Sequence, residues 1–184
     1  IDLDLVRRAD LLRVTQQQHE RDRVERALAE QRERMSLVLE ASGIGHWDWS
    51  PITDEAMFDE QWTGMIGYTP SEIEGTGTQW LRLMHPDDAA AAVEAVERHL
   101  RNETPEHRLE FRMRHRDGHW VWILAVGRVI ERDAKGQATR MVGVHVDISA
   151  RKADETALAE ATTEALRANR AKSEFLANMS HEIR

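Results

Sequence analysis

Residues 107–132 read HRLEFRMRHRDGHWVWILAVGRVIER and carry the clearest strand signal of the chain. Up to residue 115, apolar and charged residues alternate strictly, which predicts a strand with one buried face. Residues 116–118, Arg-Asp-Gly, are the signal of a tight turn between antiparallel strands. Residues 119–132 continue as a second, mostly apolar strand. The stretch therefore predicts a long β-hairpin.

Outward from this hairpin, further strands are predicted on both sides. Residues 140–148 form a third strand after a turn that contains Gly136, and residues 46–50 and 56–59 form two short strands near the start. A longer helix is expected over residues 89–100. The strand at 119–132 is apolar on both faces, unlike a half-solvated strand, so the N-terminal helix of this chain or of a partner is expected to cover the second face.

The two ends of the chain contain neither proline nor glycine over residues 1–40 and 150–184, and each end predicts a long helix. Apolar residues recur at steps of three and four, which is typical of a coiled-coil dimer seam. The predicted seam residues are Val24, Leu28, Met35, Val38, Leu158, Leu176 and Met179. The alternative is a solvated helix that packs on its own domain. A weak seam in the middle of the C-terminal helix is what a switchable helix needs.

Composition excludes several function classes. The chain has no cysteine, so disulfides, thiolate metal sites and flavin-cysteine photochemistry are excluded. The net charge is −8, and residues 41–105 carry twelve acidic but only three basic side chains, which disfavours nucleic-acid binding. No apolar run approaches the roughly 20 residues that span a bilayer. We expect a cytoplasmic region of a longer bacterial protein, with a tether to the inner membrane left open.

Five short motifs in order resemble the PAS domain family. They are GIGHWDW at 43–49, GMIGY at 64–68, MHPDD at 84–88, RDG at 116–118 and DIS at 147–149. The resemblance implies an α+β fold, in which a five-stranded antiparallel sheet with flanking short helices lies between two long coiled-coil helices. We assign residues 1–40 to an N-terminal signalling helix, 41–149 to the PAS sensor domain, 150–171 to a linker helix and 172–184 to the segment discussed next.

Residues 172–184, KSEFLANMSHEIR, resemble the phosphoacceptor box at the start of the dimerisation helix of sensor histidine kinases. The resemblance implies that His181 attacks the γ-phosphate of ATP and passes the phosphoryl group to an aspartate of a response-regulator receiver domain. A neutral imidazole is a suitable nucleophile near pH 7, and Glu182 beside it is suited to orient the ring or accept its proton. We expect the helix to be truncated here, and the 184 residues, without an ATP-binding catalytic domain, to be inactive alone.

Two further sets of residues are candidate sites. Asp147 and Ser149 lie where the last strand becomes the C-terminal helix, either as an ordinary helix cap or, as in PAS domains, as the coupling between sheet and output helix. The second set is a candidate ligand pocket formed by the tryptophans Trp47, Trp49, Trp62 and Trp80. The alternative is that these rings only fill the core.

Metal and haem sites are not expected. His99 lies on the long helix where some haem-binding PAS domains place their axial ligand, but haem is disfavoured, and His85 is interpreted as a helix-start residue. The remaining histidines lack metal spacing, although His115 and His119 flank a turn. The cofactor of the sensor thus stays unknown.

The sequence as a whole predicts the sensory and signal-transmitting region of a homodimeric two-component histidine kinase, an ATP-dependent phosphotransferase and phosphoprotein. A small molecule or a partner at the PAS domain would control phosphorylation of His181. The alternatives are a ligand-free PAS dimerisation module and the PAS domain of a cyclic-dinucleotide enzyme. The phosphoacceptor box argues against the second of these.

Overall fold

The computed structural model describes the backbone of residues 3–182 and the side chains of residues 16–34, 37 and 42–173. The chain divides into two compact units, residues 1–43 and 44–184, which are described separately. The first unit is the helix α1 (Leu3–Ser42), which ends before Gly43. Gly43 has a φ of +64°, a left-handed conformation that favours glycine and commonly terminates helices.

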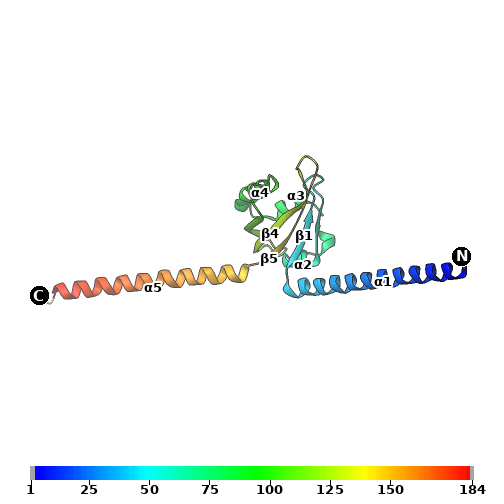
Figure 1. Ribbon diagram of the computed structural model, residues 1–184. Helices are drawn as coiled ribbons and strands as arrows, with labels where there is room; N and C mark the ends of the chain where they lie inside the picture. The colour runs from blue at the N-terminus through cyan, green and yellow to red at the C-terminus, as the bar shows by residue number, and fades with distance from the viewer. Residues whose placement is uncertain (1–2, 183–184) are drawn as a thin grey trace. The chain divides into compact units, whose positions relative to one another are not determined.

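The second unit is built on one antiparallel sheet of five strands, as predicted (Figure 1). Its strands are listed in chain order as β1 (Gly45–Trp49), β2 (Ala56–Phe58), β3 (His107–Arg114), β4 (Trp120–Arg132) and β5 (Ala138–Asp147). The spatial order is β2-β1-β5-β4-β3, so the short N-terminal hairpin joins the long meander through the pairing of β1 with β5. This pairing makes β5 a central strand that continues into the C-terminal helix.

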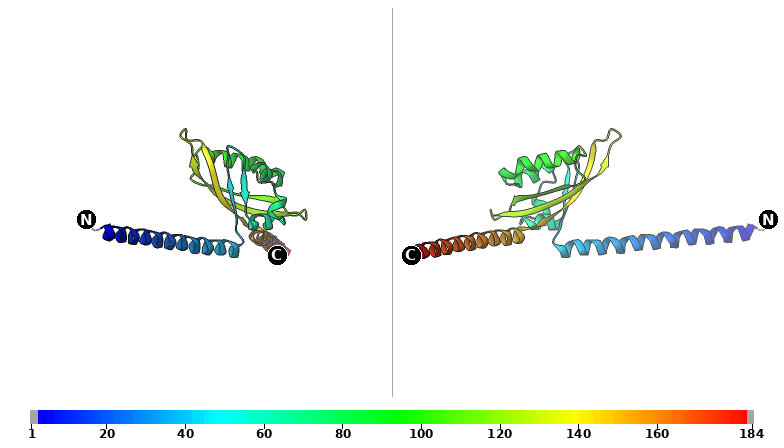
Figure 2. Two further views of the ribbon diagram at one scale, coloured as in Figure 1. Left: turned by 90° about the vertical axis from the view of Figure 1, so that its right-hand side faces the viewer. Right: turned by 60° about the vertical axis from the view of Figure 1, so that its left-hand side comes forward.

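Helices gather on one face of this sheet (Figure 2). They are α2 (Glu60–Met65), the 3-10 helix η1 (Pro70–Glu72), α3 (Gly77–Leu83) and α4 (Pro86–Leu100). His85 lies at the start of α4, as expected. Thr69 and Glu72 form a capping box, and the His85 side chain accepts a hydrogen bond from the backbone N–H of Asp87 at the start of α4. Each cap satisfies donors that a helix start leaves unpaired.

The core lies between the sheet and these helices. Trp62, Phe111, Ile66, Met113 and Ile123 are almost fully buried there. Large side chains from the strands and from the α2 region thus pack into one apolar layer. Burial of this apolar surface is the main source of stability in a domain of this size.

One row across the sheet has an unusual composition. Trp47 pairs with Gly143, Gly143 with Gly127, and Gly127 with His107. The indole ring of Trp47 lies over both glycines, because a Cβ added at Gly127 would fall 2.6 Å from Cη2 of that ring. The two glycines therefore make room for a tryptophan that lies flat on the sheet.

The opposite face of the sheet is only half-buried in this unit. Trp122, Leu124 and Val126 of β4 are intermediate, and Trp120 is 38% exposed. The helix α1 belongs to the other unit, so its predicted position over this face stays a prediction.

The C-terminal helix α5 (Ser149–Glu182) runs without interruption from the end of β5. Its beginning contacts β4, which attaches it to the sheet. Across residues 3–182, none of the helices combines the length and apolar character needed to cross a membrane.

Candidate functional site

A cavity of about 350 Å³ lies between the sheet and helices α3 and α4. A volume of this size is typical of a small-molecule site. Three of the four predicted tryptophans, Trp47, Trp49 and Trp80, line the cavity. The wall also includes residues that the sequence did not single out, namely Phe58, Met141, His107 and His145. In the sequence these four residues appear only as apolar positions of strands and as isolated histidines, so nothing marked them as cavity residues.

Trp62, the fourth predicted tryptophan, does not line the cavity. Its ring is 2% exposed and stacks on Phe58 with 4.0 Å between the centroids. Its indole N–H donates to Nδ1 of His145 over 2.7 Å. Trp62 is therefore a core residue that fixes the orientation of a cavity residue.

Two buried histidines contribute to the cavity wall. Burial lowers the pKa of His107 to about 4 and that of His145 to about 3, with a smaller contribution from the repulsion between neighbouring histidines. Both rings are therefore neutral at physiological pH. Because Nδ1 of His145 accepts the Trp62 hydrogen bond, the neutral His145 ring carries its proton on Nε2.

Asp54 on the cavity wall is held in place by several donors. Its carboxylate accepts the indole N–H of Trp49 at 3.1 Å and the hydroxyl of Thr78 at 2.6 Å. These hydrogen bonds, with that of Thr78 contributing most, lower the pKa of Asp54. The carboxylate thus joins the β1–β2 hairpin to the start of α3 and stays ionised.

His99 is not available as an axial haem ligand. Its Nε2 accepts a hydrogen bond from the N–H of Val129 at 3.1 Å, so a neutral ring carries its proton on Nδ1. Nδ1 lies 3.0 Å from the carbonyl oxygen of Thr104. With both ring nitrogens engaged, His99 joins α4 to β4 as a structural residue.

The hairpin between β3 and β4 brings together more potential metal ligands than the sequence suggested. His115, Asp117 and His119 each place one ligand atom within 4.8 Å of the others, and the two imidazole rings stack with 4.2 Å between centroids. Nδ1 of His115, however, already accepts a hydrogen bond from the N–H of Asp117 at 3.1 Å. The cluster thus contributes to the hairpin itself.

The predicted coupling residues lie at the junction between sheet and helix. The Asp147 carboxylate accepts from the N–H of Ser149, the first residue of α5, at 2.8 Å, and so satisfies one of the donors that a helix start leaves free. The Ser149 hydroxyl does not cap its own helix. It accepts from the N–H of Trp122 at 3.0 Å, while the N–H of Ile148 donates to the carbonyl of Trp122 at 2.8 Å. Both backbone groups of Trp122 thus bind residues at the start of α5.

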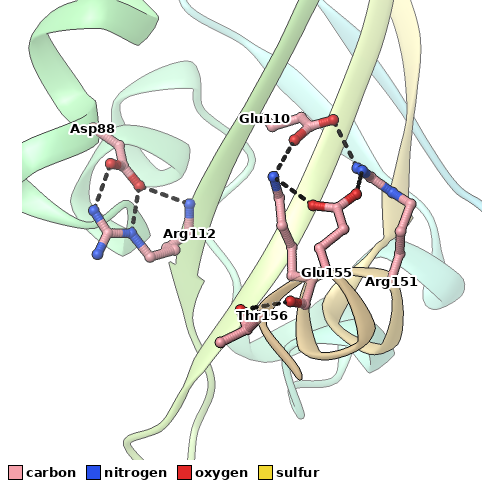
Figure 3. Close-up of polar contacts among 7 residues, drawn as sticks. Asp88, Glu110, Arg112, Arg151, Glu155 and Thr156 are labelled. Atoms are coloured by element: carbon pink, nitrogen blue, oxygen red, sulfur yellow. Dashed lines mark hydrogen bonds and ion pairs between the residues drawn. The ribbon is translucent and has the colours of Figure 1, made fainter. Parts of the chain in front are cut away.

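A cluster of ionic contacts reinforces this junction (Figure 3). Glu110 of β3 accepts from Arg151 and Lys152 of α5, each at 2.7 Å, and Glu155 on the next turn contacts the same two cations. The attraction lowers the pKa of Glu110, mainly through Lys152 and Arg151. The sequence did not reveal Glu110, because its partners lie about 40 residues away. Its position on the charged face of a strand before the hairpin was the only signal.

The ring of Trp122 is flanked by cations from both sides of the junction. The Arg112 guanidinium lies 5.3 Å from the ring centroid, and the Lys152 ammonium lies 5.0 Å from it. Arg112 is itself held by two hydrogen bonds from its guanidinium to Asp88 of α4, at 2.7 and 2.9 Å (Figure 3). A continuous chain of contacts therefore runs from α4 through β3 and Trp122 to α5.

Replacing Asp147 by alanine is expected to weaken the first turn of α5 by about 1 kcal/mol, since the N–H of Ser149 loses its acceptor. Hydrogen exchange of the amides at residues 149–152 should be several-fold faster. Asp133→Ala is the matched control, because Asp133 accepts from Lys135 and Gln137 in the β4–β5 turn and does not contact α5. Unchanged exchange at 149–152 in Asp147→Ala would contradict the assignment.

The remaining predicted site residues are placed only in part. The backbone of His181 and Glu182 lies in α5, but their side chains, and those of Met35, Val38, Leu176 and Met179, lie outside the described residues. Val24, Leu28 and Leu158 of the predicted seam are 57%, 47% and 70% exposed. These three side chains are free to form a dimer seam, but dimerisation itself stays a prediction.

Comparison with known proteins relates this unit to one family. A family model described as the PAS fold matches residues 55–145. A crystal structure of a sensory box histidine kinase/response regulator from Burkholderia thailandensis is 31% identical, with a TM-score of 0.64, and the match covers 73% of this chain and 98% of that one.

Two curated relatives are much longer proteins. Hybrid signal transduction histidine kinase A of Dictyostelium discoideum is 34% identical over 104 residues, 55% of this chain but 5% of the relative. The probable diguanylate cyclase DgcE of Escherichia coli is 26% identical over 131 residues, 71% of this chain and 12% of the relative. The chain thus spans a small part of each, and it belongs to the PAS family, with relatives among the sensor domains of histidine kinases and diguanylate cyclases.

Proposed function

We propose that this chain is the sensory and signal-transmitting region of a two-component histidine kinase, in which the PAS domain controls phosphorylation of His181. The observation that carries the proposal is the uninterrupted helix α5. It begins at a junction bound to the sheet through Trp122 and extends to Glu182. At 1.5 Å per residue, its 34 residues span about 50 Å.

The contacts support a route for the signal. Met141 and His145 of β5 line the cavity, and the same strand leads to Asp147 and the start of α5. A ligand that alters the packing of β5 therefore shifts the residues that set the helix start. A helix bound at one end converts such a shift into rotation, bending or unwinding, which changes access to His181.

The chemistry proposed for His181 is phosphoryl transfer. One ring nitrogen attacks the γ-phosphorus of ATP, the bond to the bridging oxygen breaks, and ADP leaves. The ring proton passes to a base, for which the adjacent Glu182 is the candidate. The phosphoryl group then moves from the imidazole to an aspartate of a receiver domain. The catalytic domain that binds ATP is supplied by the longer protein.

Two other functions compete with this proposal. The relationship to a diguanylate cyclase supports a PAS domain that controls a cyclic-dinucleotide enzyme. The thirteen residues 172–184 favour the kinase, because they match its phosphoacceptor box while α5 continues into them. The other competitor is a ligand-free dimerisation module, for which a colourless and empty tight dimer in solution would be the supporting result.

Phosphorylation of the full-length protein tests the proposal. With γ-labelled ATP, we expect an acid-labile label in the wild type and at least a hundredfold less in His181→Gln, with ATP binding retained. His119→Gln is the matched control, because His119 is an exposed histidine on the hairpin. A His181→Gln protein that is labelled like the wild type would exclude His181 as the phosphoacceptor.

A further inference from the structure

The wall of the PAS cavity contains buried polar atoms that have no partner among the described residues. They are the indole Nε1 donors of Trp47 and Trp80 and the Nδ1 atom of His107, whose role depends on the tautomer of its neutral ring. All three side chains line the cavity. A buried donor that no acceptor satisfies is rare in folded proteins, and it points to a partner that the chain does not itself provide. An indole N–H can only donate, so that partner must accept.

The rest of the wall limits the charge of a ligand. The described residues around the cavity include the carboxylates Asp54 and Glu97 but no lysine or arginine. His107 and His145 are neutral, as shown above. An anion would therefore meet negative groups without a compensating cation, and its desolvation would be unfavourable. A neutral acceptor such as a carbonyl oxygen has no such cost.

The shape of the wall favours an aromatic body. Trp47, Trp49, Phe58 and Trp80 surround a space of about 350 Å³. Aromatic rings of this kind pack favourably against other flat rings, either offset or edge to face. Gly143 and Gly127 leave room for the Trp47 ring, which lies over them and lines the cavity.

We infer that the cavity binds a neutral aromatic compound with a carbonyl oxygen, which accepts hydrogen bonds from the indole groups of Trp47 and Trp80. This inference names the ligand class of the sensor and so rests on the proposed function. It assigns distinct roles to the walls: the rings supply contact area, and the two indole N–H groups select an acceptor.

A pair of nearly isosteric probes tests the inference by titration calorimetry on the 184-residue chain. 1-Acetylnaphthalene carries the carbonyl, and 1-ethylnaphthalene does not. The ethyl compound is the more hydrophobic and would bind more tightly to a purely apolar cavity. We expect the reverse, with the acetyl compound preferred about fivefold, as one satisfied neutral hydrogen bond provides. The anion 1-naphthoate should bind at least tenfold more weakly than the acetyl compound.

Two variants locate the donors. Trp80→Phe and Trp47→Phe each keep an aromatic ring and remove one N–H, so the acetyl preference should fall or reverse. If Trp47→Phe does not fold, the Trp80→Phe variant at the half-buried position and the pair of probes on the wild type still test the inference. An ethyl compound that binds as tightly as the acetyl compound, no binding of either, or tight binding of 1-naphthoate would overturn the inference. Labelling of His181 is measured independently, so failure here and failure of the kinase proposal are distinguishable.

Discussion

Acidification from pH 7 to pH 5 is expected to lower the free energy of unfolding of the PAS unit by about 4 kcal/mol. The cause is the pair of buried histidines, whose pKa values fall from 6.5 to about 4 for His107 and to about 3 for His145. Below pH 6.5 the unfolded chain takes up a proton at each ring, and the folded chain does not. At pH 5 each ring therefore lowers the free energy of unfolding by about 2 kcal/mol through proton linkage.

The direction and the pH window are specific to these histidines. A carboxylate with a lowered pKa, such as Asp88 or Glu110, loses its stabilising contribution only as the pH falls through its own lower range. Urea unfolding at pH 7 and pH 5, followed by tryptophan fluorescence, measures the difference. His107→Gln should reduce the loss to about 2 kcal/mol, whereas His119→Gln on the exposed hairpin should leave it unchanged. Equal stability of the wild type at both pH values would refute the assignment.

Replacement of Gly143 by alanine is expected to destabilise the PAS unit by about 3 kcal/mol. A Cβ at this position would overlap the carbonyl oxygen of Val126 and the Cζ2 atom of Trp47. The carbonyl belongs to the neighbouring strand and cannot move without breaking the pairing of β4 with β5. The pairing would therefore be strained, the ring of Trp47 would also be displaced, and overpacking of this kind is strongly destabilising. Because Trp47 lines the cavity, ligand binding should be lost as well.

The matched control is the same substitution at Gly64. This glycine lies in α2, and an added Cβ there would have no atom within 4 Å. Alanine should therefore be neutral or stabilise by about 0.5 to 1 kcal/mol, because it restricts the unfolded chain and favours helix. Urea midpoints of the two variants provide the comparison. If Gly143→Ala is as stable as Gly64→Ala, the proposed role of the glycine row is wrong.

The strands and their order of appearance were predictable from local patterns. The alternation at residues 107–115 follows from the two-residue period of a strand, and the Arg-Asp-Gly turn follows from the conformation that Gly118 adopts, with a φ of +91°. The caps at Thr69 and His85 depend on neighbours two or three residues away. Such features are encoded within a short window, so the sequence alone suffices for them.

The cavity residues were predictable only where the residue type is itself distinctive. Trp47, Trp49 and Trp80 were expected at the cavity because large aromatic residues are rare and prominent, yet Trp62 shares these properties and belongs to the core. Trp62 differs in that its indole N–H donates to His145, a residue 83 positions away. Composition does not contain that information.

The strands, the helix caps, the long terminal helices and the family of the sensor are thus encoded locally, since each depends on periodicity or a contiguous motif. Three features instead depend on the packed fold: which tryptophans face the cavity, the bond between Ser149 and Trp122, and the contacts of Glu110 with Arg151 and Lys152. These contacts join residues that are far apart in the chain. They exist only because the order β2-β1-β5-β4-β3 brings them to the same row or the same end of the sheet.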